Sequence, residues 1–108
     1  MNDIKLDFEK GNGLIPAVVQ DAETGEILML AFQDKEAYQK TVETGEAHFW
    51  SRSRKELWKK GEKSGNTFKV LEILTDCDND SVILKVEHDE NLKACHTGER
   101  SCFFKKIL

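Results

Sequence analysis

The chain of 108 residues has few cysteines and no long hydrophobic run. No segment approaches the ~20 apolar residues that cross a bilayer, and the first residues lack the charged and apolar regions of a secretory signal. We therefore expect no membrane partner and a cytoplasmic location. Three cysteines are an odd number and a poor disulfide framework, so metal or redox chemistry is the more typical use of these thiols.

The sequence also lacks internal repeats, low-complexity tracts and an interdomain linker. Residues 1–108 are therefore expected to form one domain, which would bury only about two thirds of its unfolded surface. A core of this size gains from a bound metal ion or a partner subunit.

Positive charge is concentrated in one segment. The chain has a net charge of −4, yet residues 51–63 carry +4 and the remainder −8. A basic segment on an acidic chain favours a small anionic ligand, such as a phosphorylated metabolite, over a long nucleic acid, which needs an extended basic face. A solvated helix face explains these charges equally well. The basic residues of the segment are Arg52, Arg54, Lys55, Lys59, Lys60 and Lys63.

Local patterns predict an α+β fold with a mostly antiparallel sheet and one or two short helices. Residues 15–20 and 26–32 are apolar runs around a segment of turn composition, which predicts a β-hairpin. Asp34 is a candidate N-cap and Gly45 a stop signal, so residues 35–44 are expected to be helical. The expected inner face of this helix consists of Ala37, Tyr38, Thr41 and Val42.

The remaining elements have weaker signals. Residues 47–51 predict a short strand and residues 55–60 a short helix, followed by a loop through Asn66. Strands are expected at 68–75 and 82–87, and an edge strand at 102–107.

Ligands for two kinds of metal gather near the end of the chain, in Asp76-Cys77-Asp78-Asn79-Asp80, Ala94-Cys95-His96-Thr97-Gly98 and Ser101-Cys102-Phe103. Thiolates favour zinc, whereas carboxylates favour magnesium or calcium. Three thiolates leave tetrahedral zinc one ligand short, which is typical of a catalytic site with a bound water. If residues 76–80 are extended, the three aspartates share one face and Cys77 points away.

Other interpretations of these residues remain open at this point. From Asp76 the spacing partly matches an EF-hand loop, but Ser81 stands where glycine is expected and the flanks are strand-like. The aspartates could simply decorate a turn. A single cysteine is more often a small buried residue than a ligand. His96 suits either a fourth zinc ligand or a base.

These three motifs resemble those of phosphoribosyl-AMP cyclohydrolases of histidine biosynthesis. The resemblance covers roughly residues 14 to 104 and includes Leu28-Met29-Leu30-Ala31, Thr44-Gly45, Trp50-Ser51-Arg52-Ser53-Arg54, Leu57-Trp58, Lys60-Gly61-Glu62 and Ser64-Gly65-Asn66. Members of this family often carry a phosphoribosyl-ATP pyrophosphatase domain after the cyclohydrolase. No residues remain for one here, so a monofunctional form is expected.

The resemblance implies an intertwined homodimer that binds zinc and magnesium. Zinc would be held by Cys77 of one subunit with Cys95 and Cys102 of the other, and magnesium by Asp76, Asp78 and Asp80. The implied reaction is hydrolytic opening of the adenine ring of 1-(5-phosphoribosyl)-AMP: water adds to C6 and the N1–C6 bond breaks. His96 is our candidate for moving the proton of the attacking water.

The phosphorylated nucleotide substrate implies a use for the basic segment. Arginine offers a planar fork to phosphate oxygens, loop residues offer further donors, and indole rings stack on a base. The candidate substrate-binding residues are Trp50, Ser51, Arg52, Ser53, Arg54, Trp58, Gly61, Ser64, Gly65 and Asn66.

Two departures from the family pattern lie outside the expected ligands. Glu90-Asn91-Leu92-Lys93 replaces a glycine-containing turn before Ala94, and Phe32-Gln33-Asp34 replaces a more usual aromatic-Met-Asn. The main rival to an enzyme is a zinc-stabilised module that binds phosphate or RNA through the basic segment. A thiol redox factor is less well supported because no C-x-x-C motif is present.

Overall fold

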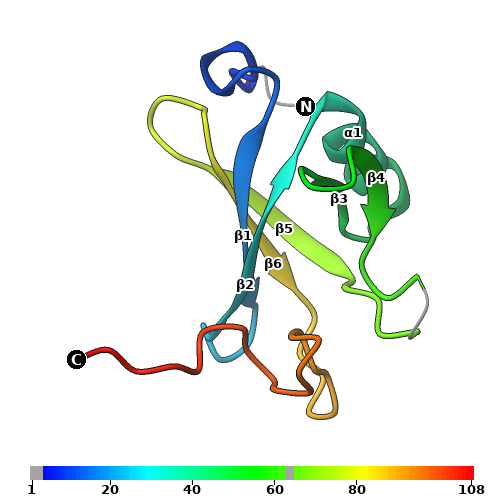
Figure 1. Cartoon of the computed structure of the whole chain (residues 1–108). Helices are drawn as coiled ribbons and strands as arrows, with labels where there is room; N and C mark the ends of the chain where they lie inside the picture. Colours follow the sequence, from blue (N-terminus) through cyan, green and yellow to red (C-terminus); the bar gives the residue numbers. More distant parts are fainter. Residues whose placement is uncertain (1–3, 63–64) are drawn as a thin grey trace.

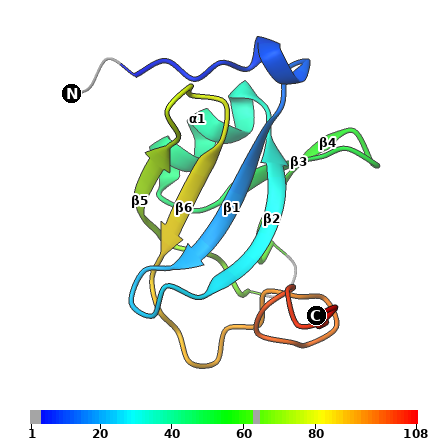
Figure 2. The same ribbon diagram turned by 90° about the vertical axis from the view of Figure 1, so that its left-hand side faces the viewer.

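The computed structural model describes residues 4–62 and 65–108, and these form a twisted six-stranded sheet with one α-helix against one face (Figures 1 and 2). No helix among these residues has both the length and the apolar character needed to cross a membrane. The strand order is β4-β3-β2-β1-β6-β5. The elements in chain order are the 3-10 helix η1 (Glu9–Gly11), β1 (Ile15–Asp21), β2 (Ile27–Gln33), α1 (Lys35–Thr44), β3 (His48–Ser51), β4 (Glu56–Lys59), β5 (Val70–Thr75) and β6 (Val82–Val86).

The α+β prediction is confirmed, and the sheet is mixed. Four strand pairings are antiparallel, including the predicted hairpin of β1 and β2, whereas β1 and β6 run parallel in the centre. The parallel pairing aligns Ala17 with Val82 and Asp21 with Val86. The turn before β6 therefore lies near the start of β1, and the segment after β6 lies near its end.

Helix α1 has the predicted limits because both of its ends are capped locally. The Asp34 side chain accepts a hydrogen bond from the Ala37 N–H at 2.8 Å, and Gly45, at φ 75°, donates its N–H to the Thr41 carbonyl. Ala37 and Thr41 are buried as expected. Val42 is wrongly assigned to the inner face, since it is 57% exposed; the helix buries a narrow stripe against β2 and β3.

Two other predictions are wrong. Residues 55–60 form no helix, because Glu56–Lys59 pairs with β3 as a strand after a turn that ends at Lys55, at φ 52°. Residues 102–107 form no edge strand: Cys102 donates its N–H to the Leu28 carbonyl at 2.7 Å, and the chain then leaves the sheet. Strand β5 begins at Val70, later than expected.

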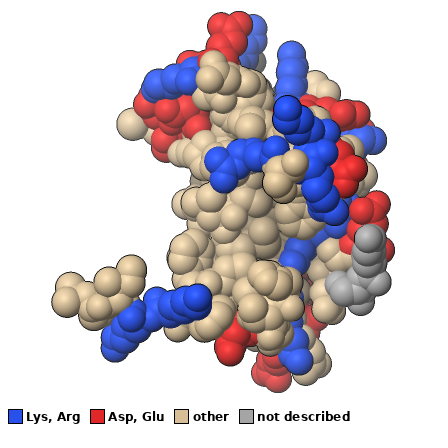
Figure 3. Space-filling view, viewed as in Figure 1, with Lys and Arg blue, Asp and Glu red and all other residues tan. Residues whose placement is uncertain are grey.

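The core lies on the helix side of the sheet. Alternate residues of β1 and β6, such as Val19 and Leu84, are fully buried there with Phe49 and Phe68. The opposite face has an apolar row across four paired strands, formed by Leu30, Val18, Ile83 and Leu74. None of these four is buried, so the row is available to a partner. Figure 3 shows this face only from the side, at the left of the molecule, where mostly uncharged surface lies between charged groups above and the C-terminal segment below.

Candidate active site

The turn between β5 and β6 brings three carboxylates together. One oxygen from each of Asp76, Asp78 and Asp80 lies within 4.8 Å of the others. The three aspartates therefore lie together, but a turn brings them together and not the extended backbone on which our argument was conditional. Asn79, at φ 61°, donates its N–H to the Asp76 carbonyl at 3.2 Å and closes a tight turn.

A cation already neutralises part of this cluster. The Lys10 ammonium lies 2.8 Å from Asp78 and 2.9 Å from Asp80, and these contacts raise the pKa of Lys10. A hydrogen bond from the Ser81 side chain holds the pKa of Asp76 well below its usual range. Lys10 lowers the pKa of Asp80, but the neighbouring carboxylates outweigh it and the net shift is upward. Clustered oxygens that repel one another fit a hard divalent cation such as magnesium.

Cys95 and Cys102 form a second donor group at the end of the loop after β6. The Thr97 hydroxyl donates to the Cys95 sulfur at 3.1 Å and lowers the pKa of that thiol. Burial raises the pKa of Cys102, and so does its contact with Cys95. The two thiols therefore influence each other's ionisation, and their soft donor atoms fit zinc.

Lys60 lies beside this thiol pair, whereas the sequence analysis placed it only in the basic segment expected to meet an anionic ligand. Its ammonium donates to the Ala94 carbonyl at 2.6 Å, next to Cys95. Burial lowers the pKa of Lys60, while the nearby Cys102 and Cys95 oppose that shift. A positive charge at this position favours the thiolate forms that a metal requires.

Cys77 does not join the other two cysteines within one chain. It is exposed in the β5–β6 turn, near the start of β1, whereas Cys102 is bonded to Leu28 near the end of β1. Figures 1 and 2 show the two segments at opposite ends of the sheet. A single chain thus supplies two thiols at one end and the third thiol, beside the carboxylates, at the other.

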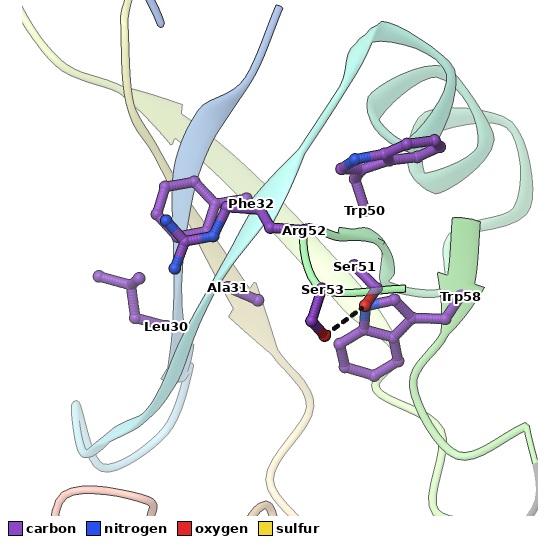
Figure 4. Close-up of a pocket in the computed structure, with 8 residues that line it drawn as sticks. All are labelled: Leu30, Ala31, Phe32, Trp50, Ser51, Arg52, Ser53 and Trp58. Carbon is purple, nitrogen blue, oxygen red and sulfur yellow. Dashed lines mark hydrogen bonds between the residues drawn. The ribbon is translucent and has the colours of Figure 1, made fainter. Parts of the chain in front are cut away.

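Several predicted substrate-binding residues line one open pocket of about 560 Å³. The β3–β4 hairpin faces β2 across it (Figure 4). The Arg52 guanidinium lies 3.9 Å from the centroid of the Phe32 ring, on which it stacks. Trp58 also packs on Phe49, with ring centroids 5.0 Å apart, so part of its role is structural. The lining residues are Leu30, Ala31, Phe32, Trp50, Ser51, Arg52, Ser53 and Trp58.

Other predicted site residues lie away from this pocket. Arg54 is exposed and pairs with Glu56 at 3.5 Å. Gly65 donates its N–H to the Gly61 carbonyl at 2.7 Å, and a Cβ on Gly61 would lie 2.3 Å from the Asn66 backbone. Gly61 is therefore needed for the shape of this loop. Ser64 lies outside the described residues.

His96 occupies a corner of the turn that carries Cys95. The Gly98 N–H donates to the Cys95 carbonyl at 3.0 Å, and Gly98 has φ 94°, which suits glycine. His96 is exposed in this turn. It is thus accessible to a substrate bound beside the thiol pair.

Comparisons with known proteins show the family of this chain. The family model described as phosphoribosyl-AMP cyclohydrolase matches residues 29–104. The chain belongs to the phosphoribosyl-AMP cyclohydrolase family. It is 62% identical over 104 residues to a phosphoribosyl-AMP cyclohydrolase of Desulfatibacillum aliphaticivorans, covering 96% of this chain and 82% of that one. It is 58% identical over 106 residues to the enzyme of the same name from Methanococcoides burtonii, covering 96% and 86%.

The part of the chain that matches the phosphoribosyl-AMP cyclohydrolase family includes both donor groups and the pocket. A third relative of the same name, from Geotalea uraniireducens, is 58% identical over 103 residues, covering 95% of this chain and 82% of its own. Two residues that contact the donor groups or their supporting loop, Lys10 and Asp21, precede the range of the family match. No sequence motif marked either of them.

Proposed function

We propose that this chain is a phosphoribosyl-AMP cyclohydrolase that opens the adenine ring of 1-(5-phosphoribosyl)-AMP by hydrolysis. Water adds to C6 and the N1–C6 bond breaks, which gives the formimino-aminoimidazole carboxamide ribonucleotide of the third step of histidine biosynthesis. One observation carries the proposal: a chain of this family holds a pair of soft thiol donors and a separate trio of hard carboxylate donors.

The proposed enzyme is a homodimer with active sites shared between subunits. In this dimer the open faces of the two sheets pack together around a two-fold axis that lies in the interface, perpendicular to the strands. The strands of the second copy then run in the opposite direction, so the Cys77 end of one subunit meets the Cys95 and Cys102 end of the other. Covering this face removes the apolar row of Leu30, Val18, Ile83 and Leu74 from water, which stabilises the dimer. Exposed Phe103 and Phe104 extend the apolar surface from the thiol end.

In this proposal Cys77, Cys95 and Cys102 hold zinc, and Asp76, Asp78 and Asp80 hold magnesium. Bound zinc supplies Lewis acidity, which lowers the pKa of a coordinated water to about 7. His96 takes up the proton of the attacking water, because it is exposed in the same turn as Cys95. The positive charge of Lys60 stabilises the thiolate forms of Cys95 and Cys102.

The substrate is held by the β3–β4 hairpin and the loop after it. Trp50 and Trp58 stack their rings on the purine. The Arg52 guanidinium, which stacks on Phe32 in the free chain, moves off this ring and binds a phosphate. None of the proposed metal ligands lines this pocket in one chain. The second subunit is therefore expected to complete the surface between the pocket and the metal.

Turnover of the proposed substrate is the direct test. The reduced protein, loaded with zinc and magnesium, is incubated with phosphoribosyl-AMP while loss of the purine absorbance is followed. We expect turnover that a chelator abolishes and added zinc restores. A metal-loaded, folded protein that leaves the nucleotide unchanged would instead favour the non-enzymatic binding module.

Replacing Asp78 with Asn should separate the two metals. The change removes one carboxylate charge from the trio, so we expect the magnesium concentration for half-maximal activity to rise by about 10-fold or more, with zinc content unchanged. The measurements are a magnesium titration of activity and elemental analysis of bound zinc. Loss of zinc with an unchanged magnesium response would reverse the assignment. Glu43→Gln is a matched control, because it also removes one exposed carboxylate charge and Glu43, in α1, lies outside the trio.

A further inference from the structure

A buried carboxylate outside the proposed reaction lies at the end of β1. Asp21 is 1% exposed. Its Oδ1 accepts hydrogen bonds from the backbone N–H groups of Glu23 and Thr24 at 2.8 and 2.9 Å. Its Oδ2 accepts from His88 and Arg100, both at 2.7 Å. A carboxylate this well buried is stable only with such partners, so its contacts define one conformation.

Arg100 uses every nitrogen of its guanidinium to join three segments. NH2 donates to Asp21 at the end of β1, Nε donates to Glu26 before β2 at 2.8 Å, and NH1 donates to the Asp89 carbonyl at 2.6 Å. A planar guanidinium satisfies these three acceptors at fixed angles, which the ammonium group of lysine cannot do. Arg100 therefore ties the loop after β6 to the β1–β2 hairpin.

This loop carries both thiols of the candidate metal site. Between β6 and the end of the chain the described residues form no helix or strand, so the loop depends on individual contacts for its shape. The Arg100 carbonyl accepts the Ala94 N–H at 2.9 Å, and the Glu99 carbonyl accepts the Cys95 N–H at 3.1 Å. On the other side, Ser101 donates its hydroxyl to the Ile27 carbonyl at 2.7 Å. Arg100 thus lies at the point where the Cys95 and Cys102 segments are fixed together.

We propose that Arg100, held by the buried Asp21 and by His88, is a positioning residue that keeps the Cys95 and Cys102 thiols at the separation a metal ion needs. The inference rests on the proposed zinc site. It adds a residue that contacts neither metal nor substrate but decides how well ordered the thiol pair is before an ion binds. Such supporting contacts are typically worth 10- to 100-fold in metal affinity.

The test is a cobalt titration of the reduced, metal-free full-length protein, in competition with a chelator of known affinity. Cobalt bound to thiolates gives a near-ultraviolet charge-transfer band, so it reports the thiol pair independently of activity. Arg100→Met is expected to weaken cobalt binding 10- to 100-fold. Arg100→Lys keeps the charge but reaches fewer acceptors, and it should lie between wild type and Arg100→Met. Lys69→Met removes a surface partner of Glu87 and should bind cobalt like wild type.

The outcomes separate this inference from the proposed function. Equal cobalt affinity in wild type and Arg100→Met overturns the positioning role and leaves the metal site intact. A wild-type protein without a thiolate band overturns the zinc site and the positioning role together. If Arg100→Met does not fold, Arg100→Lys decides alone: an unchanged affinity and band overturn the inference, and a weakened affinity with a native circular dichroism spectrum supports it. A Lys69→Met protein as weak as the Arg100 variants also overturns it.

Discussion

Cys77→Ser and Cys95→Ser proteins are each expected to be inactive alone and to regain activity when their subunits are combined. Each variant lacks one of the three thiolates of the proposed zinc site, so its zinc content should fall with its turnover. In a mixed dimer, one site carries both lesions while the other receives intact ligands from each chain. Random assortment would restore about a quarter of all sites. Activity and bound zinc are measured after the two proteins are unfolded and refolded together.

The matched control is a mixture of Cys95→Ser with Cys102→Ser. Both cysteines belong to the same end of the sheet, so neither site of that mixed dimer regains an intact thiol pair and the mixture should remain inactive. Verified mixed dimers of Cys77→Ser and Cys95→Ser that show no activity would contradict the shared site. Full zinc retention in any single variant would remove that cysteine from the ligand set.

His96→Ala is expected to lower kcat by about 10²- to 10⁴-fold while the protein keeps its fold and most of its zinc. The reason is that His96 is the exposed side chain beside Cys95 in the turn that carries this thiol, where it can accept a proton from the attacking water. Steady-state kinetics and metal analysis of the same preparation provide the measurement.

Glu99→Ala is a suitable control for this variant, because the exposed Glu99 contributes its backbone carbonyl to the turn and keeps it after substitution. Its kcat should stay within about 2-fold of wild type, which is small on the scale of acid–base catalysis. If His96→Ala loses zinc in proportion to activity, His96 is a ligand and the site is closed by four protein groups. An unchanged kcat would remove His96 from the chemistry.

The sequence was enough to predict an element where residues close along the chain determine its backbone conformation. Asp34 and Gly45 cap α1 through bonds to its own first and last turns, so its limits were predictable. Residues 55–60 lacked such a signal, and their strand conformation depends on pairing with β3. The convergence of Asp76, Asp78 and Asp80 was predicted correctly from an extended segment, although a turn produces it. In the turn, the left-handed backbone of Asn79, at φ 61°, and the hydrogen bond from the Asp80 N–H to Asp76 Oδ1 at 3.0 Å bring them together.

The sequence by itself determined the donor atoms, the helix, most strands and the family. The tertiary structure alone decided where the donors lie, because contacts across long stretches of chain leave no local pattern. The Arg100 bond to Asp21 spans 79 positions, the Lys10 bond to Asp78 spans 68, and the Lys60 bond to Ala94 spans 34. The parallel pairing of β1 with β6 places Cys77 and the Cys95–Cys102 pair at opposite ends of one sheet. Strand direction, which is set by packing between distant segments, therefore decides that one chain cannot close a three-thiol site.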